Sequence, residues 1–129
     1  MSPSEVLRAA TYLLVPDVAA AGAYYERALG FHCDYAAGNP PEFAIYSRGG
    51  LAVMFRRAPD GSRIVPKEAQ GGTWDAFCWV ESVDGLYDEL KSRGATFAYH
   101  PVVQPYGMKE FAVRDPTGYV LGFGQDWQS

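Results

Sequence analysis

The side chains with the greatest capacity for chemistry are scattered along this chain. Cys33 and Cys78 lie far apart and have no nearby Cys or His framework, so their spacing predicts two reduced thiols rather than a disulfide or a zinc site. Neither cysteine has an identifiable base partner, nor does Ser62, and the sequence contains no Gly-rich phosphate loop, nucleophile elbow or paired-carboxylate motif. These residues therefore give no support to nucleophilic catalysis.

The segment 74–80 carries a more informative pattern, because it is apolar and has the composition of a β-strand. Side chains alternate across a strand, so Asp75, Phe77 and Trp79 are expected to share one face. The opposite face carries the smaller residues Ala76, Cys78 and Val80. Small residues suit close contact with a helix, whereas two large rings on one face suit a flat, apolar ligand.

The elements that position this strand occur twice. Apolar, β-prone residues 9–15 end at Pro16, Asp17 can cap a helix, and Gly30 suits its left-handed C-terminal cap, which predicts a helix over 18–29. Three further strands are expected at 31–35, 43–46 and 51–55, the last two joined by a hairpin at 48–50.

The same order returns at an offset of 65 residues, which places Val80 on Val15 and Val83 on Val18. Ser82 is the expected helix cap, and the helix is expected to stop at Arg93 and Gly94. The remaining strands are expected at 97–102, 109–114 and 119–124, the last two joined by the turn Asp115-Pro116-Thr117-Gly118.

Each unit thus contains a strand, a helix and three strands. The pattern predicts an α+β fold of two βαβββ modules whose curved mixed sheets face one another, with the helices on the outside. We expect one domain over 1–129, with the first module at about 8–58, a turn-rich linker at about 59–73 and the second module at about 74–126.

Composition narrows the class of partner. A net charge of −4 without a Lys/Arg cluster argues against nucleic-acid binding, and a neutral or cationic ligand fits better. The N-terminus lacks the pattern of a signal peptide, and no segment approaches the roughly 20 apolar residues of a membrane span. We expect a soluble, unprocessed, cytoplasmic protein without a membrane partner.

The segment from Ala10 to Asp17, the sequence Tyr-Tyr-Glu-Arg-Ala-Leu-Gly-Phe at 24–31 and the turn at 115–118 together resemble the vicinal oxygen chelate superfamily. That superfamily includes glyoxalase I, extradiol dioxygenases, fosfomycin-resistance enzymes and bleomycin-resistance proteins. The resemblance covers about 8–125 and implies the fold expected above. Its bleomycin-resistance branch binds ligands without catalysis and pairs as homodimers, so the resemblance implies a homodimer here.

Enzymes of the superfamily hold a divalent metal with His or Glu from the inner faces of their strands. The matching positions here carry Ala10, Asp75 and Gly122, and the strand at 51–55 contains no carboxylate or imidazole. A stable divalent site generally draws three or four protein ligands. The resemblance therefore implies a chain without a catalytic metal or other cofactor, and a binding protein rather than an enzyme.

The expected site is an aromatic-lined pocket between the sheets. Phe77, Trp79 and Tyr12 supply rings, and Gly122 leaves room opposite them, since glycine in a strand often marks close approach by a ligand. Two carboxylates could partner a cation, and a loop tyrosine could close the pocket. The residues expected to bind ligand are Tyr12, Asp75, Phe77, Trp79, Tyr106, Glu110 and Gly122. The alternative is that the rings simply fill the space as core.

The sequence therefore predicts a metal-free protein that sequesters a small aromatic or cationic molecule, such as an antibiotic, by ring stacking. One rival is a metal-dependent lyase or dioxygenase that uses the unmatched ligands Asp75, His100 and Glu110. A second rival is a structural or regulatory subunit whose inner surface is packed shut.

Overall fold

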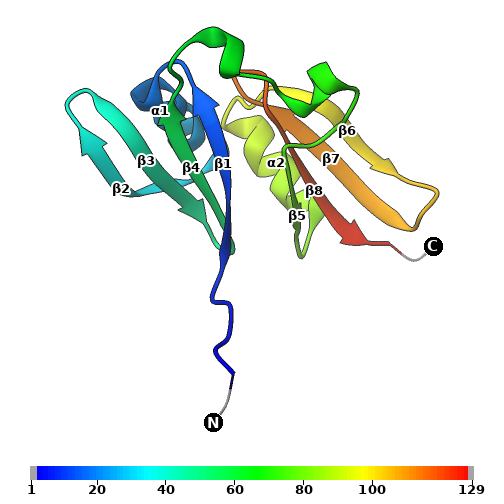
Figure 1. The fold of residues 1–129 in the computed structure, drawn as a ribbon. Helices are drawn as coiled ribbons and strands as arrows, with labels where there is room; N and C mark the ends of the chain where they lie inside the picture. The colour runs from blue at the N-terminus through cyan, green and yellow to red at the C-terminus, as the bar shows by residue number, and fades with distance from the viewer. Residues whose placement is uncertain (1–2, 128–129) are drawn as a thin grey trace.

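A computed structural model of the chain describes residues 3–127 as two four-stranded mixed sheets with two α-helices (Figure 1). The first sheet has the strand order β1-β4-β3-β2, and the second has the order β5-β8-β7-β6. The strands of the first sheet are β1 Ala9–Val15, β2 His32–Gly38, β3 Pro41–Arg48 and β4 Leu51–Arg57. Those of the second are β5 Ala76–Trp79, β6 Phe97–Val103, β7 Met108–Arg114 and β8 Val120–Asp126. The predicted fold class is confirmed.

Both helices begin and end where their capping residues predict. Helix α1 (Val18–Leu29) begins at Asp17, whose carboxylate accepts a 3.0 Å hydrogen bond from the Ala20 N–H, and it ends at Gly30 with φ at 73°. Helix α2 (Val83–Ser92) begins at Ser82, whose hydroxyl oxygen accepts a 3.0 Å hydrogen bond from the Gly85 N–H. These caps satisfy N–H groups that a helix leaves without partners in its first turn.

We call residues 9–57 the first module and residues 76–126 the second. In each module the first strand pairs in parallel with the last, β1 with β4 and β5 with β8, so β1 and β5 are both edge strands. The alternation predicted for β5 is confirmed, because Ala76, Cys78 and Val80 pack against the hydrophobic core on the side of the helix. Figure 1 shows both helices behind the sheets, so no helix covers the other face of either sheet.

The two modules share one hydrophobic core rather than having one each. Helix α1 makes the connection, because the Tyr25 hydroxyl donates a 2.7 Å hydrogen bond to Asp115 Oδ2 in the second module. The neighbouring Tyr24 hydroxyl oxygen accepts a 3.1 Å hydrogen bond from the Thr96 N–H. Helix α1 of the first module therefore also packs against the second module and is hydrogen-bonded to it.

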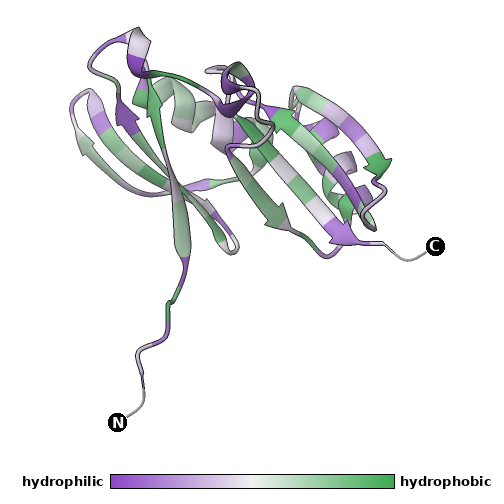
Figure 2. Cartoon of the chain, turned by 45° about the vertical axis from the view of Figure 1, so that its right-hand side comes forward, coloured by the Kyte–Doolittle hydropathy of each residue, from purple (hydrophilic) through white to green (hydrophobic). Residues whose placement is uncertain are grey.

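The linker between the modules runs over the surface and is more hydrophilic than the strands it joins (Figure 2). It contains two short 3₁₀ turns, Gly61–Arg63 and Lys67–Gln70. Arg114 anchors it through a bidentate pair with Glu68, with nitrogen–oxygen distances of 3.0 and 2.8 Å. Within residues 3–127, neither helix is long and apolar enough to cross a membrane.

Candidate functional site

A cleft of about 1210 Å³ lies where the two modules meet. Its first wall comes from the start of β1, the end of α1 and the turn between β3 and β4, and its second wall comes from β5 and α2. The lining is mostly apolar and includes Leu29, Phe31, Leu51, Val80, Leu86 and Leu90. Clefts between structural halves with mostly apolar walls are common ligand sites.

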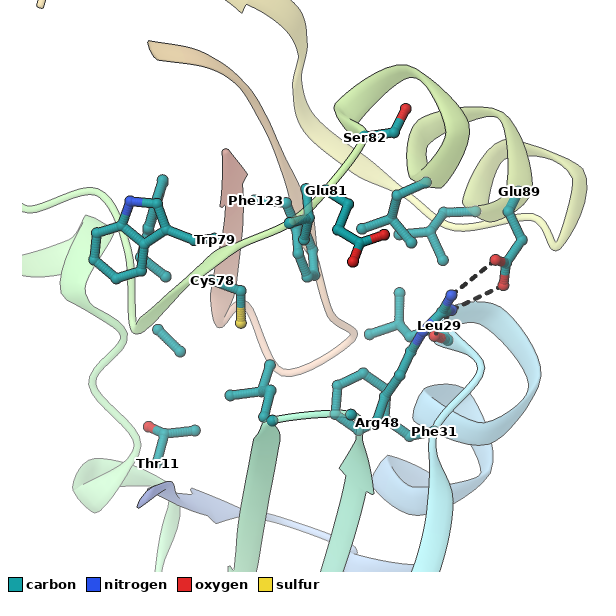
Figure 3. A pocket seen from close by; sticks show the side chains of 18 of the residues that line it. Thr11, Leu29, Phe31, Arg48, Cys78, Trp79, Glu81, Ser82, Glu89 and Phe123 are labelled. Carbon is teal, nitrogen blue, oxygen red and sulfur yellow. Dashed lines mark hydrogen bonds and ion pairs between the residues drawn. The ribbon is translucent and has the colours of Figure 1, made fainter. Parts of the chain in front are cut away.

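One end of the cleft is closed by a charged pair (Figure 3). The Arg48 guanidinium donates two 2.8 Å hydrogen bonds to the Glu89 carboxylate and a third, of 2.9 Å, to the carbonyl oxygen of Leu29. Arg93 also donates to Glu89, at 2.8 Å. Two guanidinium groups share one carboxylate here, so the cluster joins the modules and keeps one positive charge that is not offset within it.

This pair predicts a pH dependence of stability. The hydrogen bonds from Arg48 lower the pKa of Glu89 to about 2, whereas an unfolded glutamate titrates near 4.3. The pair therefore stabilises the fold above pH ~4.3, and the contribution is lost as the pH falls towards 2. We expect Glu89→Gln to cost about 1 kcal/mol near pH 7, a modest value because the side chain is 37% exposed and screened.

Urea unfolding of both proteins at pH 7 and at pH 2.5 measures the effect. The difference between wild type and variant should shrink at the lower pH. The matched control is Glu42→Gln, which removes an exposed carboxylate paired with Arg57 and should change little at either pH. A difference that grows on acidification would contradict the assignment.

Some positions in the second wall of the cleft are less tightly packed than the corresponding positions of the first module. The pairs related by the 65-residue offset are Leu13 with Cys78, Val15 with Val80, and Tyr25 with Leu90. All three residues of the first module are buried, whereas Cys78 and Val80 are only half-buried. At Cys78 the second module carries a smaller side chain than the first, whereas at Leu86, which corresponds to Ala21, it carries a larger one.

Cys78 lies in the wall of this cleft, with its sulfur directed into it (Figure 3). Burial raises the pKa of the thiol to about 11, so the thiol stays protonated near neutral pH. Because the thiolate is the nucleophile, this cysteine behaves as a small apolar residue. Cys33 is exposed and also free.

Two of the aromatic residues predicted for the site lie at the border between the cleft and the helix-free face of the second sheet. Phe77 and Trp79 pack edge to face, with ring centroids 5.2 Å apart, and both line the cleft. Trp79 is 73% exposed at the end of an edge strand. A ring with this exposure is available for stacking on a ligand.

The space at Gly122 is not free, which corrects the expectation that this glycine makes room for a ligand. A Cβ added there would lie 2.6 Å from Trp74 Cδ1 and 2.7 Å from Phe77 Cδ2, and one added at Gly124 would lie 2.7 Å from Phe77 Cζ. The glycines are needed because two rings of the chain itself lie directly on the sheet. At this position the structure agrees with the alternative interpretation, in which aromatic rings of the chain fill the space as part of the core.

Glu110 and Tyr106 form a separate cluster on the same face of the second sheet, which no helix covers. Glu110 is 1% exposed, and its Oε1 accepts hydrogen bonds from Tyr106 at 2.6 Å, Gln104 at 3.1 Å and Tyr99 at 3.2 Å. The Trp74 indole N–H donates in turn to the Tyr99 hydroxyl oxygen, at 2.9 Å. The carboxylate thus lies in a cage of polar and aromatic groups.

The other two predicted residues have local partners. Both carboxylate oxygens of Asp75 accept backbone hydrogen bonds, from Lys67 N–H at 3.0 Å and from Val120 N–H at 2.8 Å, so this side chain fastens the linker to β8. Tyr12 lies on the first sheet, is 55% exposed and accepts a 3.3 Å hydrogen bond from Arg56 Nε. It lines a smaller pocket of about 340 Å³ and not the cleft.

The positions where enzymes of the superfamily hold a metal do not fit one here. Ala10 and Gly122 supply no donor, and both oxygens of Asp75 are engaged. Across residues 3–127, three or more His, Cys, Asp or Glu side chains never gather closely enough to hold an ion. His100 lies on the helix side of its sheet, where its Nδ1 is 2.9 Å from the Tyr87 hydroxyl oxygen.

Sequence reasoning missed several residues of the cleft and cage. Arg48 and Glu89 are 41 positions apart, and nothing in their local sequence indicates that they meet. Tyr99 could have been found by alternation, but β6 is irregular on both sides of it. Trp74 precedes β5, so strand alternation does not place its ring.

The comparisons with known proteins agree with this fold. Residues 7–123 match the Glyoxalase/Bleomycin resistance protein/Dioxygenase superfamily. TioX from Micromonospora sp. ML1 is 24% identical over 92% of this chain and 98% of its own, with a TM-score of 0.73. A bleomycin resistance determinant encoded on transposon Tn5 is 24% identical over 94% and 98%, with a TM-score of 0.72.

A bleomycin-binding protein in complex with bleomycin is 24% identical over 94% of this chain and 99% of its own, with a TM-score of 0.70. No curated protein sequence matches the chain. At these identities the solved structures show a shared fold, while the superfamily match spans nearly the whole chain. The chain therefore belongs to the Glyoxalase/Bleomycin resistance protein/Dioxygenase superfamily.

Proposed function

We propose that this chain binds and sequesters a small aromatic molecule, without a metal or other cofactor and without catalysis. The observation that carries the proposal is the apolar cleft of about 1210 Å³ with Phe77 and Trp79 at its border. Its polar groups include the Arg48–Glu89 ion pair, the Glu81 carboxylate and the protonated Cys78 thiol, beside walls that are mostly apolar. The complex of a structurally similar protein with bleomycin makes an antibiotic a reasonable class of ligand.

We propose Trp79 and Phe77 as the stacking residues, with Glu110 and Tyr106 as a second part of the site. Asp75, Tyr12 and Gly122 contribute by shaping the surroundings, since their partners lie within the chain. A cytoplasmic location remains part of the proposal, because both cysteines are free thiols. Cell fractionation would test that location.

The experiment is a titration of tryptophan fluorescence with bleomycin and a panel of planar aromatic compounds. We expect quenching in the wild type and binding weakened about tenfold or more in Trp79→Ala, because the stacking ring is lost. Cys78→Leu should also weaken binding, because it fills the cleft as Leu13 fills the first module. The matched control is Trp127→Phe, which removes a tryptophan that packs under Lys109.

Binding that survives Trp79→Ala unchanged would move the site away from β5. If none of the compounds quenches the fluorescence, the rival of a structural subunit with a closed inner surface is favoured. The rings that lie on Gly122 and Gly124 already support this rival for that face of the second sheet. Metal analysis of protein purified without a His-tag tests the enzyme rival. One tightly held divalent ion per chain would contradict the proposal.

We also propose a homodimer, as the resemblance implies. Large apolar side chains remain exposed on both sheets, including Tyr12, Tyr35 and Trp79, and Tyr106 is exposed in the loop between β6 and β7. Exposed apolar patches on a globular chain commonly mark association surfaces. Sedimentation velocity over a range of concentrations would show a dimer, and a monomer throughout would contradict this part.

A further inference from the structure

One oxygen of the Glu110 carboxylate is buried without a partner. Oε1 accepts all three hydrogen bonds from the cage, whereas Oε2 has none from any residue in 3–127. A buried polar atom without a partner costs free energy, and more so when the group is charged. Such an atom is rare enough in folded proteins to require an explanation.

No cation of the described chain neutralises this carboxylate. The nearest basic residue in sequence, Lys109, pairs instead with Asp84 at 2.9 Å and lies over the Trp127 ring. Arg114, on the same strand face as Glu110, pairs with Glu68. The cage is therefore a negative group without a counter-ion, surrounded by groups that can only donate hydrogen bonds to it.

The rings around Glu110 favour a cation as the missing partner. Trp74, Phe77, Tyr99 and Tyr106 are linked by contacts and hydrogen bonds, and aromatic faces attract positive charge. The hydrogen bond to Glu110 contributes most to raising the pKa of Tyr106 to about 12, so this hydroxyl remains a donor near neutral pH. Tyr106 is 62% exposed in the loop between β6 and β7, so its movement would uncover the carboxylate.

The register of the second sheet connects this cage to the stacking residues. Trp79 pairs with Gly124 on β8, and Gly124 pairs with Glu110 on β7, so the three residues form one row on one face. Neighbouring strands lie about 4.8 Å apart, which puts the backbones of Trp79 and Glu110 roughly 10 Å apart. Phe77 and Met108 lie on Gly124 between them. A molecule with an aromatic ring and a short side chain ending in a cation can reach both by passing over these two side chains.

We propose that Glu110 is a subsite for a protonated amine with at least one N–H, carried by the aromatic ligand that stacks on Trp79. The ammonium group donates a hydrogen bond to Oε2 and lies among the rings, with Tyr106 closing over it. The inference rests on the proposed binding function and narrows its ligand to an arylalkylamine. A quaternary ammonium, which has no N–H, cannot supply the missing donor.

Three matched probes test this by isothermal titration calorimetry on the full chain: tryptamine, its N,N,N-trimethyl derivative and the neutral alcohol tryptophol. We expect tryptamine to bind at least about tenfold more tightly than either analogue, because only it offers both charge and donor. Glu110→Gln should reduce tryptamine to the affinity of tryptophol and leave tryptophol unchanged. The control Glu42→Gln, in an exposed pair on the first module, should preserve the full advantage.

Equal binding of tryptamine and tryptophol to the wild type would overturn the subsite and leave the proposed function standing. So would an advantage of tryptamine that persists in Glu110→Gln, since Oε2 would then be only a hydrated structural carboxylate. An equal advantage for the quaternary probe would replace hydrogen bonding by simple cation attraction and contradict the requirement for an N–H. If none of the probes binds, the subsite and the aromatic site at Trp79 both fail.

Discussion

Tyr25→Phe should lower the free energy of unfolding by about 2–3 kcal/mol although it removes only one oxygen atom. Among residues 3–127 the lost hydroxyl is the sole donor to Asp115 Oδ2, while Oδ1 accepts three backbone hydrogen bonds from Thr117, Gly118 and Tyr119. Asp115 is buried, and burial raises the pKa of its carboxyl group, so an oxygen without a donor is costly here. Urea unfolding measures the loss.

The control for this variant is Tyr35→Phe, because Tyr35 lies exposed on the first sheet and should change stability by no more than about 0.5 kcal/mol. Repeating Tyr25→Phe in an Asp115→Asn background should give a smaller loss, which isolates the coupling between the two side chains. Equal losses in Tyr25→Phe and Tyr35→Phe would contradict the role of this hydrogen bond in joining the modules.

Gly122→Ala should also cost about 2–3 kcal/mol, because one methyl group would overlap two rings. Its Cβ would lie 2.6 Å from Trp74 and 2.7 Å from Phe77, and neither stiff ring can move away without leaving the sheet. Chemical denaturation measures the stability, and near-ultraviolet circular dichroism reports the displaced tryptophan.

Gly50→Ala is the matched control, because a Cβ at Gly50 meets no atom within 4 Å. It should stay within about 0.5 kcal/mol of the wild type. If Gly122→Ala were as mild, the rings would not be fixed on the glycine floor, and the expectation of free space for a ligand there would regain support.

Most of the fold could be predicted from local chemistry. Asp17 and Ser82 mark the helix starts because a side-chain oxygen there satisfies a backbone N–H, and this rule depends only on neighbours in sequence. The faces of β5 follow from alternation, which is equally local. The predicted ends of β2 and β3 are less accurate. Pairing between these two strands extends both beyond the apolar residues from which the strands were predicted.

The site depended on contacts that sequence alone does not contain. Gly122 was read as open space because its neighbour in space, Trp74, lies 48 positions earlier and outside any strand. The cleft could not be predicted because its walls come from segments far apart in the sequence, such as Arg48 and Glu89, that meet only when the two modules pack together. The missing hydrogen bond of Glu110 Oε2 likewise appears only in the structure, where all three donors bind the other carboxylate oxygen.

Because the two modules share a single hydrophobic core, the repeated sequence pattern does not produce two units that are stable separately. A chain of this size with one core is expected to unfold in one cooperative transition. Neither half, cut free, would keep the partner that covers its apolar surface.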